Sequence, residues 1–181
     1  PQYASLAVPM VSLIGSGQFG VLFGRLRGKN AARCFDQRNP SEKPSITALT
    51  YSHKYTLSSM PQISDKTYDL SISFLTPHYF ARERVKAKKY AAWIHTDYTA
   101  LSFDRSAERS MWSGYDAICG VSEFVSQGFR RTFPELAGKV QTIENILPKE
   151  LILEQTEAPQ NDMPSEESIS LLSIGRFCDA K

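Results

Sequence analysis

Three polar residues each follow a short apolar segment of the chain, and their side chains could act on one ligand together. His95 follows "YAAWI", Ser122 follows "AICGV" and Asn145 follows "VQTIE". His95 and the nearby Asp97 can hydrogen-bond sugar hydroxyls, and Ser122 precedes a helix whose free backbone N–H groups favour an anion. If the three segments are neighbouring parallel strands, the residues after them meet at one edge of the sheet, where ligands of such sheets bind.

Each of these residues also has a purely structural explanation. A histidine at the end of a strand usually has a structural role, and a serine before a helix usually only caps it. Asn145, taken alone, is a turn residue more often than a ligand. The order of His95, Ser122 and Asn145 along successive strands favours a shared site over three separate structural roles.

Strand-like and helix-like segments alternate from Tyr68 onward, with short connections. The apolar segments lack the alternation of a half-exposed strand, which indicates a parallel sheet with helices on both faces. Pro77 ends the first strand, because proline cannot donate to a strand ladder. The sequence therefore predicts an α/β fold with a Rossmann-like sheet. The predicted strands are residues 68–75, 89–95, 115–122 and 138–144, and the predicted helices lie within 81–89, 104–112 and 123–133.

Two of the predicted helices carry clear end signals. Asp104 is a suitable N-cap for the helix that Gly114 closes, and Ser122 is a suitable N-cap for the next one. Val125 and Phe129 of that helix fall four residues apart, on one face. We expect this face to pack against the sheet.

The character of the sequence changes after the fourth predicted strand. Residues 148–167 are rich in proline and acidic residues and have no apolar period, which predicts a linker. The segment "SISLLSIG" then predicts the first strand of a second domain, so that residues 168–181 would be its first strand and turn. We expect residues 1–147 to form the Rossmann-like domain, incomplete at its N-terminus. The sequence of residues 25–67 allows no secondary-structure element to be assigned.

Composition excludes several classes of function. The 181 residues include 21 basic and 19 acidic side chains, so the net charge of +2 is too small to indicate nucleic acid as a partner. The three cysteines are widely spaced, which argues against a zinc site and a disulfide framework. No Asp-x-Asp triplet occurs, and we expect no metal ion. The sequence predicts a cytoplasmic protein without a membrane span.

A glycine pattern near the start offers a different function. Residues Gly15–Gly20 spell "GSGQFG" after the apolar "VPMVSLI", which matches the turn that binds the pyrophosphate of NAD or NADP. No acidic residue ends a strand about 20 positions later, and Pro9 interrupts the preceding segment. A flexible loop is therefore favoured over a cofactor turn, and an NAD(P)-dependent oxidoreductase remains an alternative.

A basic segment offers a second kind of contact. Residues Arg82–Lys89 contain five basic residues and one glutamate. Such a run is usually a solvated helix end. It could also attract the anionic surface of the inner membrane or a lipid diphosphate.

Three stretches of the chain resemble a known protein family. They are "KKYAAWIHTDY", "YDAICGVSEFVSQGFRRTFPELAGKVQTIEN" and "ISLLSIGRFCDAK". They are similar to the retaining GT-B glycosyltransferases of group 1, also called glycosyltransferase family four, especially those that build bacterial surface polysaccharides. The likeness covers roughly residues 65–147 and 168–181.

The resemblance implies a fold, a reaction and roles for particular residues. Such enzymes have two Rossmann-like domains that face each other across a cleft, and this chain would be the acceptor-side domain, cut off at the start of the donor-binding domain. His95 and Asp97 would be catalytic, with His95 against the transferred sugar. Ser122 and Asn145 would bind substrate.

By the same likeness, Arg176 and Lys181 would neutralise the diphosphate of a nucleotide-sugar. The partners would be that donor and a glycan or lipid-linked acceptor, with no cofactor. The family's pair of glutamates eight residues apart is absent, so we expect the chain alone to be inactive. A non-catalytic Rossmann-like binding module remains the other alternative.

Overall fold

The computed structural model describes residues 10–76 and 78–156 of the chain. The chain divides into two compact units, Pro1–Asn145 and Ile146–Lys181. The four strands of the described sheet all belong to the first unit, and so do the residues that follow them.

The described part of the second unit contains one helix. Helix α8 (Lys149–Thr156) lies within residues 148–167, for which the sequence predicted an irregular linker. Its exposed Leu151, Ile152 and Leu153 are consecutive, so they do not form one apolar face, and the segment therefore lacks a helical period of apolar residues. The predicted strand and turn at residues 168–181 lie outside the described residues.

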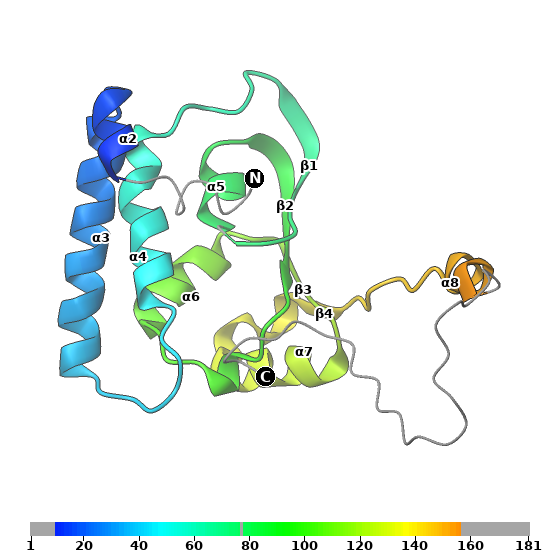
Figure 1. The fold of residues 1–181 in the computed structure, drawn as a ribbon. Coiled ribbons are helices and arrows are strands. Elements are labelled where there is room, and N and C mark those ends of the chain that lie inside the picture. The colour runs from blue at the N-terminus through cyan, green and yellow to red at the C-terminus, as the bar shows by residue number, and fades with distance from the viewer. Residues whose placement is uncertain (1–9, 77, 157–181) are drawn as a thin grey trace, which may run out of the picture. The chain divides into compact units, whose positions relative to one another are not determined.

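The first unit contains a four-stranded sheet in which all strands are parallel and follow one another in chain order (Figure 1). Helical segments separate successive strands, as they must when parallel strands are connected. The predicted α/β class with a Rossmann-like sheet is therefore confirmed. The strands are β1 (Thr67–Ser73), β2 (Lys86–Ile94), β3 (Ala117–Gly120) and β4 (Val140–Thr142).

The helices between the strands begin at the capping residues that the sequence indicated. Asp104 accepts hydrogen bonds from the backbone N–H groups of Ser106 and Ala107, and Ser122 accepts one from that of Val125. These contacts satisfy backbone donors that have no partner inside the helix. The segments are α5 (His78–Glu83), α6 (Arg105–Ser113) and α7 (Glu123–Thr132), with the short 3₁₀ helices η2 (Tyr98–Ala100) and η3 (Pro134–Lys139).

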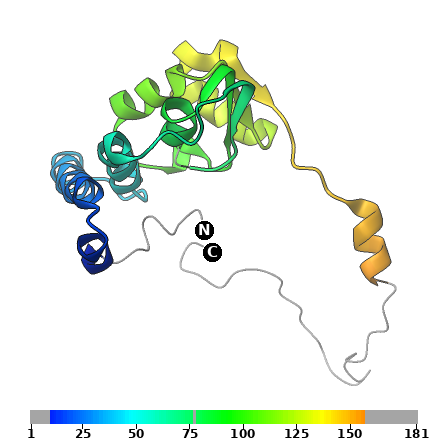
Figure 2. The ribbon, with the colours of Figure 1, turned by 90° about the horizontal axis from the view of Figure 1, so that it is seen from above.

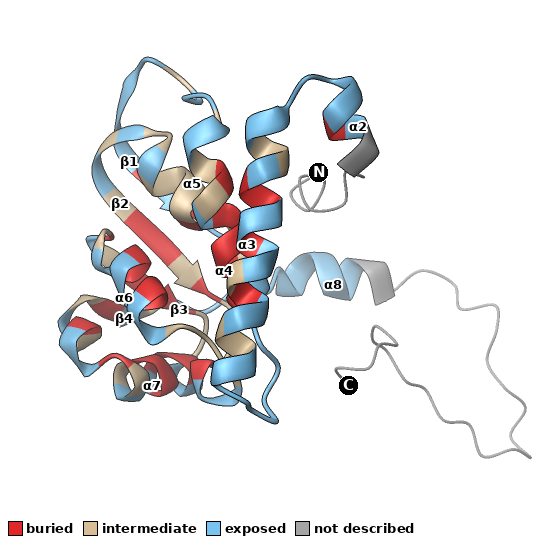
Figure 3. Cartoon of the chain, turned by 90° about the vertical axis from the view of Figure 1, so that its left-hand side faces the viewer, coloured by how far each residue is buried: buried red, intermediate tan, exposed pale blue. Residues whose placement is uncertain are grey.

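The segment before the sheet is helical, although the sequence allowed no assignment for residues 25–67. Helices α3 (Phe19–Arg38) and α4 (Thr47–Thr56) run antiparallel (Figure 1) and lie side by side (Figure 2), and η1 (Leu57–Ser59) follows them. A Cβ on Gly28 would come within 2.7 Å of the Cα of Ser52, so glycine is required where the two helices touch. The outward face of α3 is exposed (Figure 3).

The glycine pattern Gly15–Gly20 does not form a cofactor turn. A cofactor turn requires a strand before the glycines, but the residues there form helix α2 (Met10–Gly15), and α3 follows after a tight turn. Gly17 has a φ of +70°, a backbone conformation that glycine adopts without strain, so it serves this helix–helix turn. The strand–turn–helix that the oxidoreductase alternative needs is not formed, and Gly15 and Gly20 lie in helices rather than in the loop that the sequence favoured.

The core lies between the sheet and the helices that follow its strands. Ala92, Ile94, Ile118 and Val140 project from the sheet into a cluster of buried aromatic rings. These rings come from η2, α6 and α7 and the residues beside them: Tyr98, Trp112, Tyr115, Phe129 and Phe133. The described helices thus cover one face of the sheet, which we call the covered face.

The opposite face, which we call the open face, is exposed along β1 and is not covered there by any described helix of the first unit. Leu70 and Ile72 of β1, and Phe74 just after it, are each at least 50% exposed. Ser71 and Ser73, which alternate with them, are buried and point to α5, where Ser71 Oγ donates to the Ala81 carbonyl. The expectation that helices cover both faces is therefore wrong for the described part of the first unit.

The basic segment Arg82–Lys89 is not one exposed helix, because β2 begins at Lys86. Arg82 lies 4.6 Å above the ring of Tyr90, and four of the five basic side chains have acceptors. These acceptors are the Gly114 carbonyl for Arg82, the Leu57 carbonyl for Arg84, Asp69 for Lys88 and Asp116 for Lys89. No helix among the described residues is long and apolar enough to cross a membrane.

Candidate functional site

The carboxyl ends of β2, β3 and β4 lie at the same edge of the sheet. Ile94 pairs with Gly120, and Gly120 pairs with Thr142. The backbone N–H of Val121 donates to the Ile94 carbonyl, and that of Ile143 donates to the Gly120 carbonyl. The chain segments that carry His95, Ser122 and Asn145 therefore leave the sheet side by side, as the sequence predicted.

His95 is half-buried and held by the residue that follows β1. Its Nε2 lies 2.9 Å from the carbonyl oxygen of Phe74, and its ring meets the Phe74 ring edge to face at 4.6 Å between centroids. This contact orients the imidazole before any ligand arrives. Phe74 thus connects the end of β1 with the candidate residue after β2.

Asp97 has local hydrogen-bond partners. Its carboxylate accepts from the backbone N–H of Thr99 at 2.9 Å and from the Thr99 hydroxyl at 2.7 Å, which caps η2. These bonds to Thr99 hold the pKa of the Asp97 carboxyl below its usual range. The carboxylate also lies against α7, because a Cβ on Gly128 would come within 2.8 Å of Oδ1. These contacts give Asp97 a capping role beside the predicted catalytic one.

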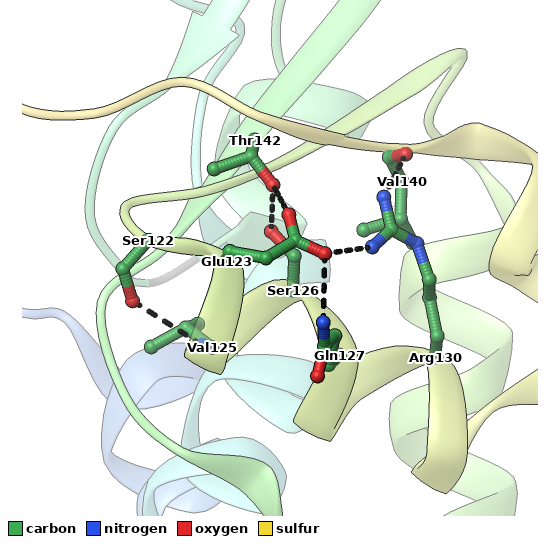
Figure 4. A network of polar contacts seen from close by, with 8 residues as sticks. All are labelled: Ser122, Glu123, Val125, Ser126, Gln127, Arg130, Val140 and Thr142. Atoms are coloured by element: carbon green, nitrogen blue, oxygen red, sulfur yellow. Dashed lines mark hydrogen bonds and ion pairs between the residues drawn. The ribbon is translucent and has the colours of Figure 1, made fainter.

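Ser122 and the first turn of α7 form a polar network with β4 (Figure 4). The Ser122 hydroxyl accepts from the Val125 N–H at 3.3 Å, as an N-cap does. The Glu123 carboxylate accepts from the Thr142 hydroxyl at 2.6 Å and from Arg130 at 3.2 Å. These hydrogen bonds, that from Thr142 foremost, lower the pKa of Glu123. The network fixes the N-terminus of α7 against the end of β4.

The remaining predicted site residues are not brought into this cluster. Asn145 is exposed, three residues beyond the end of β4. Arg176 and Lys181 lie outside the described residues. The described structure therefore brings together the neighbourhoods of His95 and Ser122.

A cavity of about 330 Å³ opens at the carboxyl ends of β1 and β2. His95 and Thr96 line it from β2, Thr76 from the end of β1, and His78 from the start of α5. Trp93, Tyr98 and Trp112 contribute aromatic surface, and residues at the start of α4 complete the wall. Ser122 and Asn145 are not among its lining residues.

A smaller cavity of about 30 Å³ shares His78 and Tyr98 with the larger one and reaches the buried Glu108. Glu108 is 1% exposed and accepts hydrogen bonds from Thr50, Tyr98 and Trp112. Burial raises the pKa of its carboxyl above the usual range, although these hydrogen bonds oppose the shift. Beneath the larger cavity lies a fully hydrogen-bonded buried acid.

His78 was missed by the sequence reasoning. It lies just after β1, as His95 lies just after β2, and the same rule about strand ends would have found it. Thr76-Pro77 was interpreted only as a strand end. Glu108 carried no usable signal, because a single glutamate in an amphipathic helix is normally placed on the exposed face.

The described residues contain no group of three His, Cys, Asp or Glu side chains that could hold a metal ion. Of the cysteines in this part of the chain, Cys34 is exposed and Cys119 is buried, and neither forms a disulfide. Burial raises the pKa of the Cys119 thiol, which makes it a poor nucleophile. The lining of the larger cavity can instead hydrogen-bond a ligand through hydroxyl and imidazole groups.

The fold and this edge define an α/β protein with a Rossmann-like parallel sheet and a small cavity at the carboxyl ends of its strands. The sequence matches no protein-family model, and no curated protein matches it either.

Proposed function

We propose that this chain is the acceptor-side domain of a retaining glycosyltransferase, which moves a sugar from a nucleotide-sugar to a surface polysaccharide or a lipid-linked glycan. The observation that carries the proposal is the position of His95 at the aligned carboxyl ends of the strands, in the wall of a cavity. Ligands of open parallel sheets bind at this edge. The resemblance of the sequence to group 1 glycosyltransferases supplies the reaction.

Under this proposal the residues of the sheet edge orient the sugar. The His95 imidazole, held by the Phe74 carbonyl, lies against the sugar ring in the cavity. The N-terminus of α7, fixed by Ser122 and Glu123, contributes backbone N–H groups and a partial positive charge toward an anionic group. Asn145 extends the same edge.

In the reaction, the bond between the anomeric carbon and the diphosphate oxygen breaks, and a bond to the acceptor oxygen forms. The proton of the acceptor hydroxyl passes to the departing diphosphate. Charge grows on that diphosphate as the sugar leaves, and cationic side chains stabilise it most when they are already in place. The proposal assigns this role to Arg176 and Lys181. Arginine offers a bidentate fork, and lysine a compact charge.

The test is the transfer reaction of the intact protein that carries this domain. Release of nucleoside diphosphate is measured from a panel of UDP-, GDP- and dTDP-sugars with lipid-linked acceptors. His95→Ala should lower kcat by at least about a hundredfold, the scale of a lost positioning or proton-transfer group. Nucleotide affinity should not change.

The control is Gln141→Ala, which removes an exposed side chain in the middle of β4, away from the cavity lining. It should leave turnover as it is. Absence of transfer with every donor, or full activity of the His95→Ala variant, would contradict the proposal. In the first case the alternative of a non-catalytic binding module gains support.

A further inference from the structure

The larger cavity has an uncharged lining, although it lies at the sheet edge where the proposed function places an anionic group. None of the described residues that line it is Asp, Glu, Lys or Arg. Its polar groups are two histidines, two threonines and a tyrosine, and the rest is aromatic or aliphatic. A charged group in such a cavity would lose its hydration without gaining a counter-charge, which is costly. The lining therefore selects an uncharged ligand.

His78 is the buried polar side chain of this wall, with 3% of its surface exposed. Its Nδ1 lies 2.8 Å from Ser73 Oγ, and Ser73 Oγ in turn donates to the Leu75 carbonyl at 3.4 Å. Nδ1 is therefore engaged by Ser73. Nε2 of His78 is the ring nitrogen that is left for a hydrogen bond to a ligand.

Nε2 has no hydrogen-bond partner among the described residues. The same part of the chain contains no fully buried side-chain nitrogen or oxygen without a partner. Nε2 must therefore reach an accessible surface, and His78 lines both the larger cavity and the smaller one beside it. Burial, with smaller contributions from His95 and His53, lowers the pKa of His78 to about 3, so the ring is neutral at physiological pH.

The aromatic walls and the size of the cavity further restrict the class of ligand that fits. Trp93, Trp112 and Tyr98 present apolar surface that suits the C–H faces of a sugar ring, and the threonines can bond its hydroxyls. About 330 Å³ is at the lower end of ligand-binding cavities, enough for one ring with its substituents.

We infer that this cavity binds a single neutral sugar ring, with His78 Nε2 hydrogen-bonded to one of its hydroxyls and His95 lying at the exposed side of the ring. The inference rests on the proposed function and deepens it in two respects. It names the sugar ring as uncharged, which excludes uronic acids, and it adds His78 as a sugar-binding residue.

The test compares neutral and acidic sugars of the same shape. Binding of methyl α-D-glucopyranoside, methyl α-D-galactopyranoside and methyl α-L-rhamnopyranoside to the intact protein is measured by titration with NMR detection. The uronic acid forms of the first two serve as charged counterparts. At least one neutral glycoside should bind, and its uronic acid should bind at least about tenfold more weakly, since it would place a charge in an uncharged wall.

His78→Leu should weaken binding of that glycoside about tenfold, the effect of leaving one hydroxyl without its hydrogen-bond partner. The matched control is His53→Leu. His53 is also buried, but it lines only the smaller cavity, so binding should stay within about twofold. If His78→Leu does not fold, the ¹⁵N shift of His78 Nε2 in the unmodified protein gives the same information, because it should move when the glycoside binds.

Equal binding of neutral and acidic sugars, no binding of any neutral glycoside, or an unchanged His78 signal would overturn the inference. These outcomes are separable from failure of the proposed function. A protein that binds neutral glycosides through His78 but releases no nucleoside diphosphate refutes the transferase and keeps the site. A protein that transfers uronic acids, with no effect of His78→Leu on KM, refutes the site and keeps the transferase.

Discussion

The apolar side chains of β2 and β3 on the covered face are buried, whereas those of β1 on the open face are exposed. On the covered face, Ile118 is fully buried and belongs to the same cluster as Phe129 of α7. On the open face, Leu70, Ile72 and Phe74 are about half exposed among the described residues. Apolar area contributes to stability only when it leaves water. The difference shows that hydrophobic residues in a strand do not by themselves locate the core.

The largest effect that tests this comparison is expected on the covered face. Phe129→Ala should cost about 3–5 kcal/mol of unfolding free energy, because Phe129 is 0% exposed and its removal leaves a cavity. The matched control is Phe124→Ala on the same helix, where the side chain is 65% exposed, and it should cost less than about 1 kcal/mol. Urea denaturation measures both. Similar losses for the two variants would show that α7 does not pack as described.

A second effect concerns pH, since the covered side of the sheet buries two neutral histidines. Burial lowers the pKa of His78 to about 3 and that of His53 to about 4. Below about pH 6.5 the unfolded chain therefore binds protons at these histidines that the folded protein does not bind. Each histidine should therefore reduce stability by about 1.4 kcal/mol per pH unit as the pH falls from about 6 to 4.5. Glu108, whose pKa is raised, acts in the opposite direction.

The measurement is the urea midpoint of the unmodified protein and of His53→Leu at pH 7, 6 and 5. The stability of the variant should fall less steeply with decreasing pH, because the contribution of one histidine is absent. Carboxylates whose pKa is lowered in the fold, such as Asp97 and Asp104, add their own acid sensitivity only near and below pH 4. Identical slopes for the two proteins would mean that His53 is not buried in its neutral form.

The smallest effect is expected on the open face. Ile72→Thr keeps the branched side chain that suits a strand and should change stability by less than about 0.5 kcal/mol, because Ile72 is 52% exposed. Ile118→Thr in β3, at a position with no exposure, serves as the contrasting control and should be far more destabilising. A loss of more than about 2 kcal/mol for Ile72→Thr would show that something outside the described residues covers this face.

Much of the fold could be predicted from local signals in the sequence. The capping positions Asp104 and Ser122 and the parallel arrangement of the strands followed from turn chemistry and from short apolar segments. The helices α3 and α4 were not recognised, because glycines such as Gly28 weaken helix propensity and matter only through contact with the neighbouring helix. Lys86 was assigned to a helix because charged residues at the start of a strand resemble a solvated helix end.

The candidate site was predicted in part. The strand-end rule placed His95 and Ser122 correctly at one edge, since parallel strands bring their carboxyl ends together. It did not find the cavity, because the cavity walls come from α4, α5, η2 and α6 as well as from the strands. Nor could it find the Thr99 contacts of Asp97, which depend on the conformation of η2.

By itself, the sequence determined where α6 and α7 start and which segments become parallel strands, because capping side chains, prolines and apolar runs act within a few residues of backbone. Only the tertiary structure decided which side chains of β1 face the helices and that His78 and His95 line one cavity. It also decided that Glu108 is buried with partners from three elements. These outcomes depend on contacts between residues far apart in the chain, and the period of a single strand is the same whichever face is covered.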